Sequence, residues 1–255
     1  MKRNINRVLC LVISFILFSC FSIYSTVSAE NVSVEELAGN WSASYYKIED
    51  LSFDISYSDM PCSLRLLTDG SYYYADKETD EHGSWILNKK TIVFTPKDAE
   101  VWYATLLDGE IVYIENGHEI VFTKEGHESS MLPSPVIAEN IDDLYGEWNV
   151  SRYFLNGYLI PADKLADYGL HLSGSLTISR NSAVLSLLIE EEQGTGNYDV
   201  SLTDGALLLA NGSNNNPVTL DLCDTGELRL VIDDPFSILY FSKVTDTEEP
   251  ITFDR

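Results

Sequence analysis

The chain has 255 residues, of which 40 are Asp or Glu and 16 are Lys or Arg, so its formal net charge at pH 7 is −24. A field of this sign repels phosphate backbones and anionic lipid surfaces, which excludes nucleic acid as an expected partner and favours cationic groups. Apolar residues make up 45% of the chain, with 15 Tyr, 10 Phe and 4 Trp, a composition typical of globular modules rich in β-strands.

The first 29 residues have the pattern of a secretory signal peptide. Three basic residues within the first seven positions precede an apolar run over residues 8–18, which is too short for a comfortable membrane span. Small side chains then occupy Val27-Ser28-Ala29, the positions that a signal peptidase reads. We therefore predict removal of residues 1–29, a mature chain that begins at Glu30, and a secreted, extracellular protein.

A second processing signal overlaps the first. Leu17-Phe18-Ser19-Cys20 resembles a bacterial lipobox, in which Cys20 is lipidated and becomes the first mature residue. In that alternative the protein is a lipoprotein on the outer face of the cell membrane, and the lipid anchor is its only expected contact with a membrane. Mass spectrometry of the mature N-terminus separates the two, because Glu30 supports secretion and a diacylglyceryl Cys20 rejects it.

The chain then repeats itself. Residues 37–46 return as residues 144–153 with five of ten positions identical, and the offset between matched landmarks grows from 107 here to 119 near the end. Unrelated β-rich segments also share turn residues, but their matches would scatter rather than drift in one direction. Loops tolerate insertions better than paired strands do, so the drift indicates a duplicated module. We predict domains over residues 30–125 and 141–245, a linker over 126–140 and a flexible tail over 246–255.

Short strands separated by tight turns dominate the first copy. Turn residues that tolerate positive φ occur at Asp69-Gly70, Asn88-Lys89, Asp108-Gly109 and Asn116-Gly117. We predict strands over residues 41–47, 64–68, 71–75, 84–87, 91–95, 102–107, 110–114 and 119–123. Strands joined by such hairpins form an antiparallel meander.

The linker and the second copy follow. Residues 126–140 contain Pro133 and Pro135 and have no regular apolar period, which indicates a partly extended, semi-rigid connection. Residues 161–169 begin with proline and end with glycine, which predicts one short helix. The strands predicted in the second copy cover residues 148–154, 176–179, 183–189, 198–202, 206–209, 218–222, 227–232 and 238–242.

These elements predict an all-β fold of two small antiparallel up-and-down β-barrels in tandem, with one short helix in the second. Closing a sheet of about eight short strands hides one face and removes its edges. An opening Gly-x-Trp, at Gly39 and Trp41 and again at Gly146 and Trp148, followed by a run of hairpins, resembles the small bacterial lipocalin-like domains of secreted proteins and lipoproteins. Asn156-Gly157 after the opening strand also resembles that family.

The resemblance implies a barrel that encloses a small apolar ligand. A Thr-Asp-Tyr strand motif and a matching disulfide pattern are missing, which argues against a large preformed cup. Tyr72 and Tyr74 share one face of their strand by the two-residue period, and they are candidates either for stacking on a ligand or for filling a small barrel. Their counterparts are Ala183 and Leu185, so the two interiors are expected to differ. The remaining ligand-binding candidates are Trp85 and Trp102.

Trp41 and Trp148 are predicted to be structural and to plug the closed end of each barrel. If Ala29 is the cleavage site, Cys62 and Cys223 are the cysteines that remain. They occupy non-equivalent places in the two copies, and both an interdomain disulfide and two buried thiols are open alternatives. No Cys-x-x-Cys or His-x-x-x-His pair accompanies them, so no metal site and no cofactor are expected.

Enzymatic motifs are not recognisable. The four histidines, at 82, 118, 127 and 171, have no neighbours that resemble a nucleophile elbow or a metalloprotease helix. The acidic stretch over residues 76–81 lacks the glycine and the twelfth-position glutamate of a calcium loop, and it is expected to be a solvated hairpin. We therefore expect no enzymatic activity.

Two functional classes fit this sequence. The first is a secreted, non-catalytic binding protein that holds a small apolar or aromatic ligand in one or both barrels. The second is an extracellular interaction or adhesion module with filled barrels, which binds another extracellular protein through its acidic exterior. The acidity alone also has a plainer interpretation, because it keeps a secreted protein soluble. An open barrel interior would favour the first class and a filled interior the second.

Overall fold

The computed structural model describes residues 32–115, 117–212, 217–233 and 236–244. The expected signal peptide over residues 1–29, the lipidation candidate Cys20 and the expected tail over 246–255 lie outside the described residues. In the part of the chain that is described, no helix is long and apolar enough to cross a membrane. The chain divides after Leu37 into two units. The first contains the one-turn helix α2 (Val34–Leu37), whose start is capped by reciprocal hydrogen bonds between Ser33 and Glu36.

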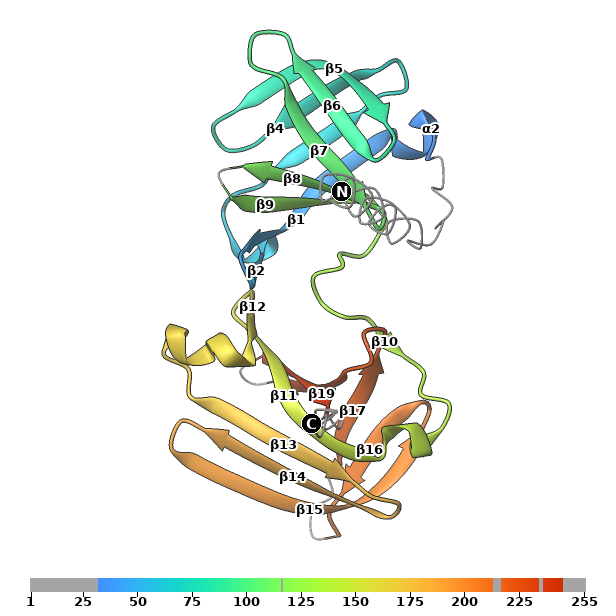
Figure 1. Ribbon diagram of the computed structural model, residues 1–255, viewed down its shortest axis with the longest axis vertical. Coiled ribbons are helices and arrows are strands. Elements are labelled where there is room, and N and C mark those ends of the chain that lie inside the picture. The colour runs from blue at the N-terminus through green and yellow to red at the C-terminus, as the bar shows by residue number, and fades with distance from the viewer. Residues whose placement is uncertain (1–31, 116, 213–216, 234–235, 245–255) are drawn as a thin grey trace, which may run out of the picture. The chain divides into compact units, whose positions relative to one another are not determined.

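Strand pairing in the second unit forms two closed circuits of eight antiparallel strands (Figure 1), which confirms the predicted all-β fold. The first circuit, here the N-terminal barrel, closes where the last strand pairs with the first from Trp41↔Lys124 to Ile48↔His118. Its strands are β1 (Gly39–Ile48), β3 (Ser63–Leu66), β4 (Ser71–Ala75), β5 (Asp80–Asn88), β6 (Thr91–Pro96), β7 (Trp102–Leu107), β8 (Glu110–Glu115) and β9 (His118–Lys124).

The second circuit, here the C-terminal barrel, closes in the same way from Trp148↔Lys243 to Leu155↔Ser237. Its strands are β11 (Gly146–Leu155), β13 (Leu172–Ile178), β14 (Ser182–Ile189), β15 (Glu192–Thr203), β16 (Ala206–Ala210), β17 (Val218–Cys223), β18 (Leu228–Asp233) and β19 (Phe236–Lys243). Each predicted strand therefore has a counterpart in the structure. The origin of the two circuits by duplication stays a prediction.

Both opening strands change partner halfway along. The first residues of β1 pair with β3, and its later residues pair with β2 (Leu51–Asp54), a strand that the sequence pattern did not predict. β11 does the same with β13 and β12 (Tyr158–Pro161). The register against the closing strand shifts at Ser44 in β1 and at Ser151 in β11, so each opening strand is bulged at the equivalent serine.

The helical segments are short and lie between strands. The helix predicted over residues 161–169 is present as the 3₁₀ helix η4 (Ala162–Tyr168). Pro161 precedes its first turn, and Gly169 ends it with a φ of 73°, as the sequence indicated. Two further 3₁₀ turns, η2 (Ile55–Tyr57) and η3 (Ile141–Leu144), begin at Asp54 and Asn140, whose side chains accept a backbone N–H two residues on.

The two barrel cores have different compositions. Tyr72 is 0% exposed and Tyr73 is 51% exposed, so the alternation predicted for β4 is confirmed. The buried core of the N-terminal barrel is rich in aromatic side chains: Trp41, Leu64, Leu66, Tyr72, Trp85, Ile92, Phe94, Leu106, Ile111 and Phe122. That of the C-terminal barrel is mostly aliphatic: Leu144, Trp148, Leu176, Ile178, Ala183, Leu185, Leu207, Leu209, Leu220, Leu228, Leu230, Leu239 and Phe241. The predicted difference between the interiors is therefore present.

Residues 126–140 are tied down more closely than the sequence predicted for a linker. Pro135–Val136 form a short strand, β10, which pairs with β17. Asp224 N–H donates to the Ser134 carbonyl at 2.9 Å, and Ala138 N–H donates to the Gly205 carbonyl at 3.1 Å. The prolines leave the segment extended, and neighbouring strands supply the hydrogen bonds that an extended backbone needs.

Tyr240 on β19 carries a polar group that the fold leaves unsatisfied. Its side chain is 0% exposed, and among the described residues its hydroxyl has no hydrogen-bond partner. A buried donor without a partner costs free energy, so Tyr240→Phe is expected to raise the free energy of unfolding by about 1 kcal/mol in urea titrations at pH 7. Tyr72→Phe is the contrasting control, because the Tyr72 hydroxyl donates to Glu81 and its removal should destabilise. A less stable Tyr240→Phe would contradict the burial argument.

Tyr240 also makes the free energy of unfolding depend on pH in the alkaline range. Burial raises the pKa of Tyr240 from 10.0 to about 12, so the folded state favours the neutral phenol. Its contribution to stability is present below pH 10 and is lost as the pH rises through about 12. Unfolding titrations between these values should show a smaller decline for Tyr240→Phe than for the unchanged chain.

Candidate functional site

The repeated Gly-x-Trp motif is a structural device of the N-terminal barrel. Trp41 is 2% exposed, and Lys124 Nζ from the closing strand lies 5.8 Å from the centroid of its ring. Gly39 has a φ of +141°, and a Cβ added there would lie 2.9 Å from Lys124 Cε. Glycine is therefore favoured at this position for two reasons. It adopts a backbone conformation that other residues rarely adopt, and it leaves room for the Lys124 side chain over the Trp41 ring.

The C-terminal barrel repeats the arrangement. Trp148 is 2% exposed, its indole N–H donates to the Leu144 carbonyl at 2.9 Å, and Lys243 Nζ lies 5.6 Å from its ring centroid. Gly146 has a φ of +132°, and an added Cβ would lie 3.1 Å from Lys243 Cε. Both tryptophans are buried core residues, and their placement at the closed end of each barrel stays a prediction.

The structure brings three of the four predicted ligand-binding residues together. Tyr72 Oη donates to Glu81 Oε1 at 2.5 Å, and Trp102 Nε1 donates to the same oxygen at 2.9 Å. The Trp102 ring is stacked on Phe94, with centroids 3.7 Å apart and planes 11° apart. Tyr74 meets Trp102 edge-on at 6.0 Å. The aromatic faces that a ligand would use are thus occupied by one another, and a ligand role for this cluster stays a prediction.

The fourth candidate, Trp85, lies elsewhere in the core. It is 2% exposed, and its Nε1 donates to the Leu67 carbonyl at 3.1 Å. The Tyr74 hydroxyl donates to Asp76 Oδ2 at 2.9 Å. Burial, followed by hydrogen bonding with the Cys62 thiol, raises the pKa of Tyr74, so its phenol is neutral at pH 7.

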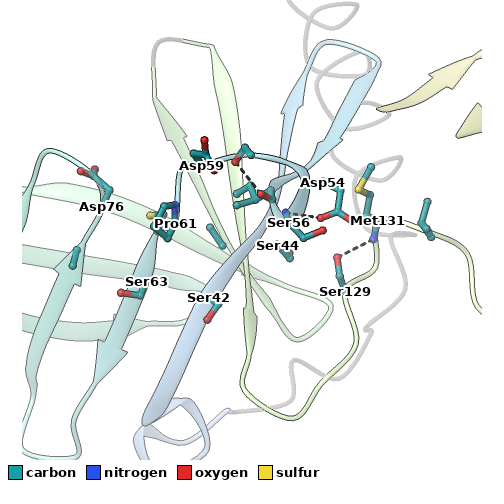
Figure 2. A pocket seen from close by; sticks show the side chains of 16 residues that line it. Ser42, Ser44, Asp54, Ser56, Asp59, Pro61, Ser63, Asp76, Ser129 and Met131 are labelled. Atoms are coloured by element: carbon teal, nitrogen blue, oxygen red, sulfur yellow. Dashed lines mark hydrogen bonds between the residues drawn. The ribbon is translucent and has the colours of Figure 1, made fainter. Parts of the chain in front are cut away.

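A hollow opens in the wall of the N-terminal barrel where β1 leaves β3. Its volume is about 1000 Å³, and side chains from β1, η2, β3, the end of β4 and residues 129–132 surround it (Figure 2). The backbone explains the opening, because β1 pairs with β3 only up to Ser42, and the next residue, Ala43, donates its N–H to the Cys62 carbonyl at 2.8 Å. Sequence patterns do not reveal this site, because it depends on that departure.

Six serines and three aspartates supply the polar groups of the lining, so we call this site the serine–aspartate hollow. Its serines are Ser42, Ser44, Ser56, Ser58, Ser63 and Ser129. Its acids are Asp54, Asp59 and Asp76, and apolar surface comes from Ala43, Ile55, Pro61, Cys62, Ala75, Met131 and Leu132. None of the predicted ligand-binding residues is part of this lining.

Two of the three carboxylates are held by neighbouring groups. Asp54 accepts the Ser56 N–H at 2.8 Å, which orients it at the start of η2. Asp76 accepts the N–H groups of Glu78 and Thr79 at 2.8 and 2.7 Å. Partial burial acts to raise the pKa of Asp76, but these hydrogen bonds outweigh it and lower the pKa, so the carboxylate is ionised at pH 7. The hollow therefore presents a fixed negative charge.

A buried glutamate anchors the wall made by residues 129–132. Glu110 is 7% exposed and accepts the N–H and the hydroxyl of Ser130 at 2.9 and 2.5 Å, and the hydroxyl of Thr123 at 3.0 Å. Thr123 Oγ1 also lies within hydrogen-bond distance, 2.9 Å, of Oγ of Ser44, the bulged serine of β1. This network connects the bulge that opens the hollow to the segment that forms its far side.

Glu227, matched to Glu110 in the sequence repeat, is buried in the same way. It is 8% exposed and accepts the hydroxyls of Ser151 at 2.7 Å and Ser242 at 3.2 Å. Where Glu110 accepts from Ser130, Glu227 pairs with the guanidinium of Arg152. Matching Gly-Glu dipeptides at residues 109–110 and 226–227 were the signal that could have revealed both glutamates.

The C-terminal barrel has its own hollow beside β11, but its chemistry is different. The volume is about 470 Å³, and the lining includes Asn149, Leu172, Ser175 and Gln193 without a charged side chain. Carboxylates thus line the hollow beside β1 and not the one beside β11.

Cysteines and acids do not form a metal centre in the described part of the chain. No group of three or more His, Cys, Asp or Glu side chains there could hold a metal ion. Cys62 and Cys223 are free and buried, so the structure favours two thiols over a bridge. Burial raises the pKa of both thiols, which keeps them protonated and unreactive at pH 7.

Comparisons with known proteins add little. No family model and no curated protein matches the chain. Among solved structures, the crystal structure of the Cpx pathway activator NlpE from Escherichia coli is similar, with 12% sequence identity and a TM-score of 0.25. The match covers 83% of this chain and 97% of that chain. We draw no inference about fold or function from a TM-score this low.

Proposed function

We propose that this protein is a non-catalytic extracellular interaction module that binds a cationic partner at the serine–aspartate hollow. The observation that carries this function is the hollow of about 1000 Å³, in which Asp54, Asp59 and Asp76 lie beside apolar surface. A hollow of that size suits a binding site, and three carboxylates in it attract a positive charge. The ring stacking and hydrogen bonding of the aromatic side chains in the same barrel support an exterior site over an interior one.

The hollow also indicates the character of the partner. Ile55 and Met131 are each only 6% exposed and form part of its lining, and Leu132 adds further apolar surface. A partner that offers both a cationic and an apolar group matches this combination, because apolar contact contributes affinity and charge contributes orientation. A lysine or arginine flanked by aliphatic side chains on an extracellular protein has this chemistry.

The proposed setting is outside the cell. The basic and apolar segments of residues 1–29 favour secretion, and lipidation at Cys20 would place the same module on the outer face of the membrane. Either outcome exposes the hollow to extracellular partners. We also propose that the two barrels are tandem lipocalin-like domains, on the strength of the repeated Gly-x-Trp frame.

Removing charge from the rim tests this function. The probes are peptides with both ends blocked that pair lysine with leucine, and their affinity for the purified chain is measured by isothermal titration calorimetry. Asp54→Asn combined with Asp59→Asn is expected to weaken binding about tenfold, equivalent to roughly 1.4 kcal/mol. Asp76 stays unchanged, because its hydrogen bonds to Glu78 and Thr79 support the β4–β5 hairpin.

The matched control is Asp98→Asn combined with Asp108→Asn. Both residues are exposed and lie outside the hollow, and the net charge changes by the same amount. This variant should bind the peptides as the unchanged chain does. Equal losses in the two double variants would show that the whole acidic surface attracts the peptides, and the proposed site would then be wrong.

A further inference from the structure

A second hollow adjoins the first on the outside of the N-terminal barrel. Its volume is about 340 Å³, and its lining includes Asn40, Arg65 and Tyr73. Ser42, Ser63 and Ala75 line both hollows, so the two form one continuous depression across β1, β3 and β4. We call this depression the β1–β3 groove. Figure 2 shows Ser42 and Ser63, where the two hollows meet.

The groove has opposite charges at its two ends. Asp54, Asp59 and Asp76 line the larger part, and Arg65 lines the smaller part. Arg65 is exposed, and among the described residues no hydrogen bond or ion pair of its guanidinium is found. A planar guanidinium that is free to make two parallel hydrogen bonds is a strong recognition group for a carboxylate.

The neighbours of Arg65 shape that end of the groove. Arg65 pairs directly with Asn40 on β1 and with Tyr73 on β4, so these three side chains are next to one another on the outer face. The Tyr73 ring is backed by His82, with ring centroids 6.3 Å apart and planes 24° apart. The groove thus has an aromatic ring next to its cation.

The spacing of the charges limits the size of the occupant. Arg65 lies two residues along β3 from Ser63, roughly 7 Å at the rise of a strand, and the larger hollow continues beyond Ser63 to Asp59. The α-amino and α-carboxylate groups of a single amino acid are attached to one Cα and do not span this separation. An extended peptide of three or more residues, at about 3.3 Å each, spans this separation.

We propose that the groove binds the C-terminal end of an extended peptide, with the terminal carboxylate at Arg65 and a cationic side chain or amino group at the aspartates. This inference rests on the proposed function, because it uses the same aspartates. The smaller hollow has about one third of the volume of the larger, which suits a chain end better than a continuing chain. A nucleic acid or an anionic lipid fits poorly, since the aspartates repel phosphate.

The experiment compares two chemical forms of one peptide. The probe is Lys-Leu-Ala-Ala-Leu with a free C-terminus, and its C-terminal amide is the reference, both titrated into the full chain by calorimetry. We expect the free acid to bind about tenfold more tightly than the amide. Arg65→Gln should reduce the affinity for the acid to that for the amide and leave the amide unaffected. Arg65→Lys should restore part of the difference, because it keeps the charge without the planar fork.

Lys97→Gln is the matched control. Lys97 is exposed and lies outside both hollows, and its substitution removes one positive charge, as Arg65→Gln does. It should leave the acid-to-amide ratio unchanged. Equal affinity of the two forms for the unchanged chain would overturn the inference. So would an amide with an internal glutamate that binds as tightly as the free acid, because the carboxylate would then come from a side chain.

The outcomes separate this inference from the proposed function. If blocked cationic peptides bind through Asp54 and Asp59 but the free carboxylate adds nothing, the interaction site stands and the recognition of a chain end is wrong. If no peptide of either kind binds, both are wrong. Loss of the acid-to-amide difference in Arg65→Gln, with Asp54→Asn and Asp59→Asn weakening both forms, supports the two together.

Discussion

Replacing Trp148 with alanine is expected to lower the free energy of unfolding by about 3 to 5 kcal/mol. The indole is 2% exposed and packs among the aliphatic core of the C-terminal barrel, so its removal leaves a cavity that closed strands cannot easily fill. The loss also removes the hydrogen bond to the Leu144 carbonyl and the contact of Lys243 with the ring. Urea unfolding followed by circular dichroism measures this effect.

Trp148→Phe provides the graded control for that variant. It keeps an aromatic ring in the core but loses the indole N–H, so its cost should be clearly smaller than that of alanine. Trp41→Ala should lower the free energy of unfolding by about as much as Trp148→Ala, because the Trp41 side chain is also 2% exposed. Whole domains are stable by about 5 to 15 kcal/mol, so the expected loss is a large part of the total. An alanine variant of unchanged stability would show that the tryptophan is not a core residue.

Glu227→Ala is expected to cost about 3 kcal/mol, because it leaves a partly buried cation without its partner. The Glu227 side chain is 10% exposed and that of Arg152 is 27% exposed, so solvent screens the pair only weakly. The hydroxyls of Thr225 and Ser242 lose their acceptor at the same time, whereas that of Ser151 keeps the Tyr240 carbonyl. Denaturant titrations at pH 7 measure the change.

Glu110→Ala separates the charge from the hydrogen bonds. The Glu110 carboxylate accepts from Ser130 and Thr123, neither of which is charged, so its loss should cost less, about 1 to 3 kcal/mol. Adding Arg152→Ala to Glu227→Ala should recover part of the stability, because no cation then remains without its partner. A double variant that is simply the sum of the two single losses would argue against charge as the cause.

The strands and turns of this fold were largely predictable. The two-residue period of β4 correctly placed Tyr72 inside and Tyr73 outside, and a proline and a glycine marked the bounds of η4. Strands β2 and β12 were missed, because each is four residues long and continues a hairpin without a distinct pattern of its own. β15 begins at Glu192, six residues before the predicted start, because β14 pairs with it up to Ile189↔Glu192. Cross-strand partners extend a strand beyond its own pattern.

The candidate site was less predictable than the fold. The aromatic residues chosen from the pattern, Tyr72, Tyr74 and Trp102, contact one another, and their ligand role stays a prediction. Asp54, Asp59 and Arg65 gave no signal of function, because isolated charges in short polar segments are common on any surface. They share a groove where β1 leaves β3 after Ser42 and pairs with β2 from Tyr45.

The sequence by itself determined the class of fold, the repeated frame of Gly39 and Trp41 with Gly146 and Trp148, and the unequal interiors of the two copies. These features depend on local periods, on turn chemistry and on volumes that each residue carries with it. Only the tertiary structure decided that Trp102 stacks on Phe94, that Glu110 and Glu227 are buried, and that opposite charges line one groove. Those outcomes depend on residues far apart in the chain, which strand pairing and the bulges at Ser44 and Ser151 bring together.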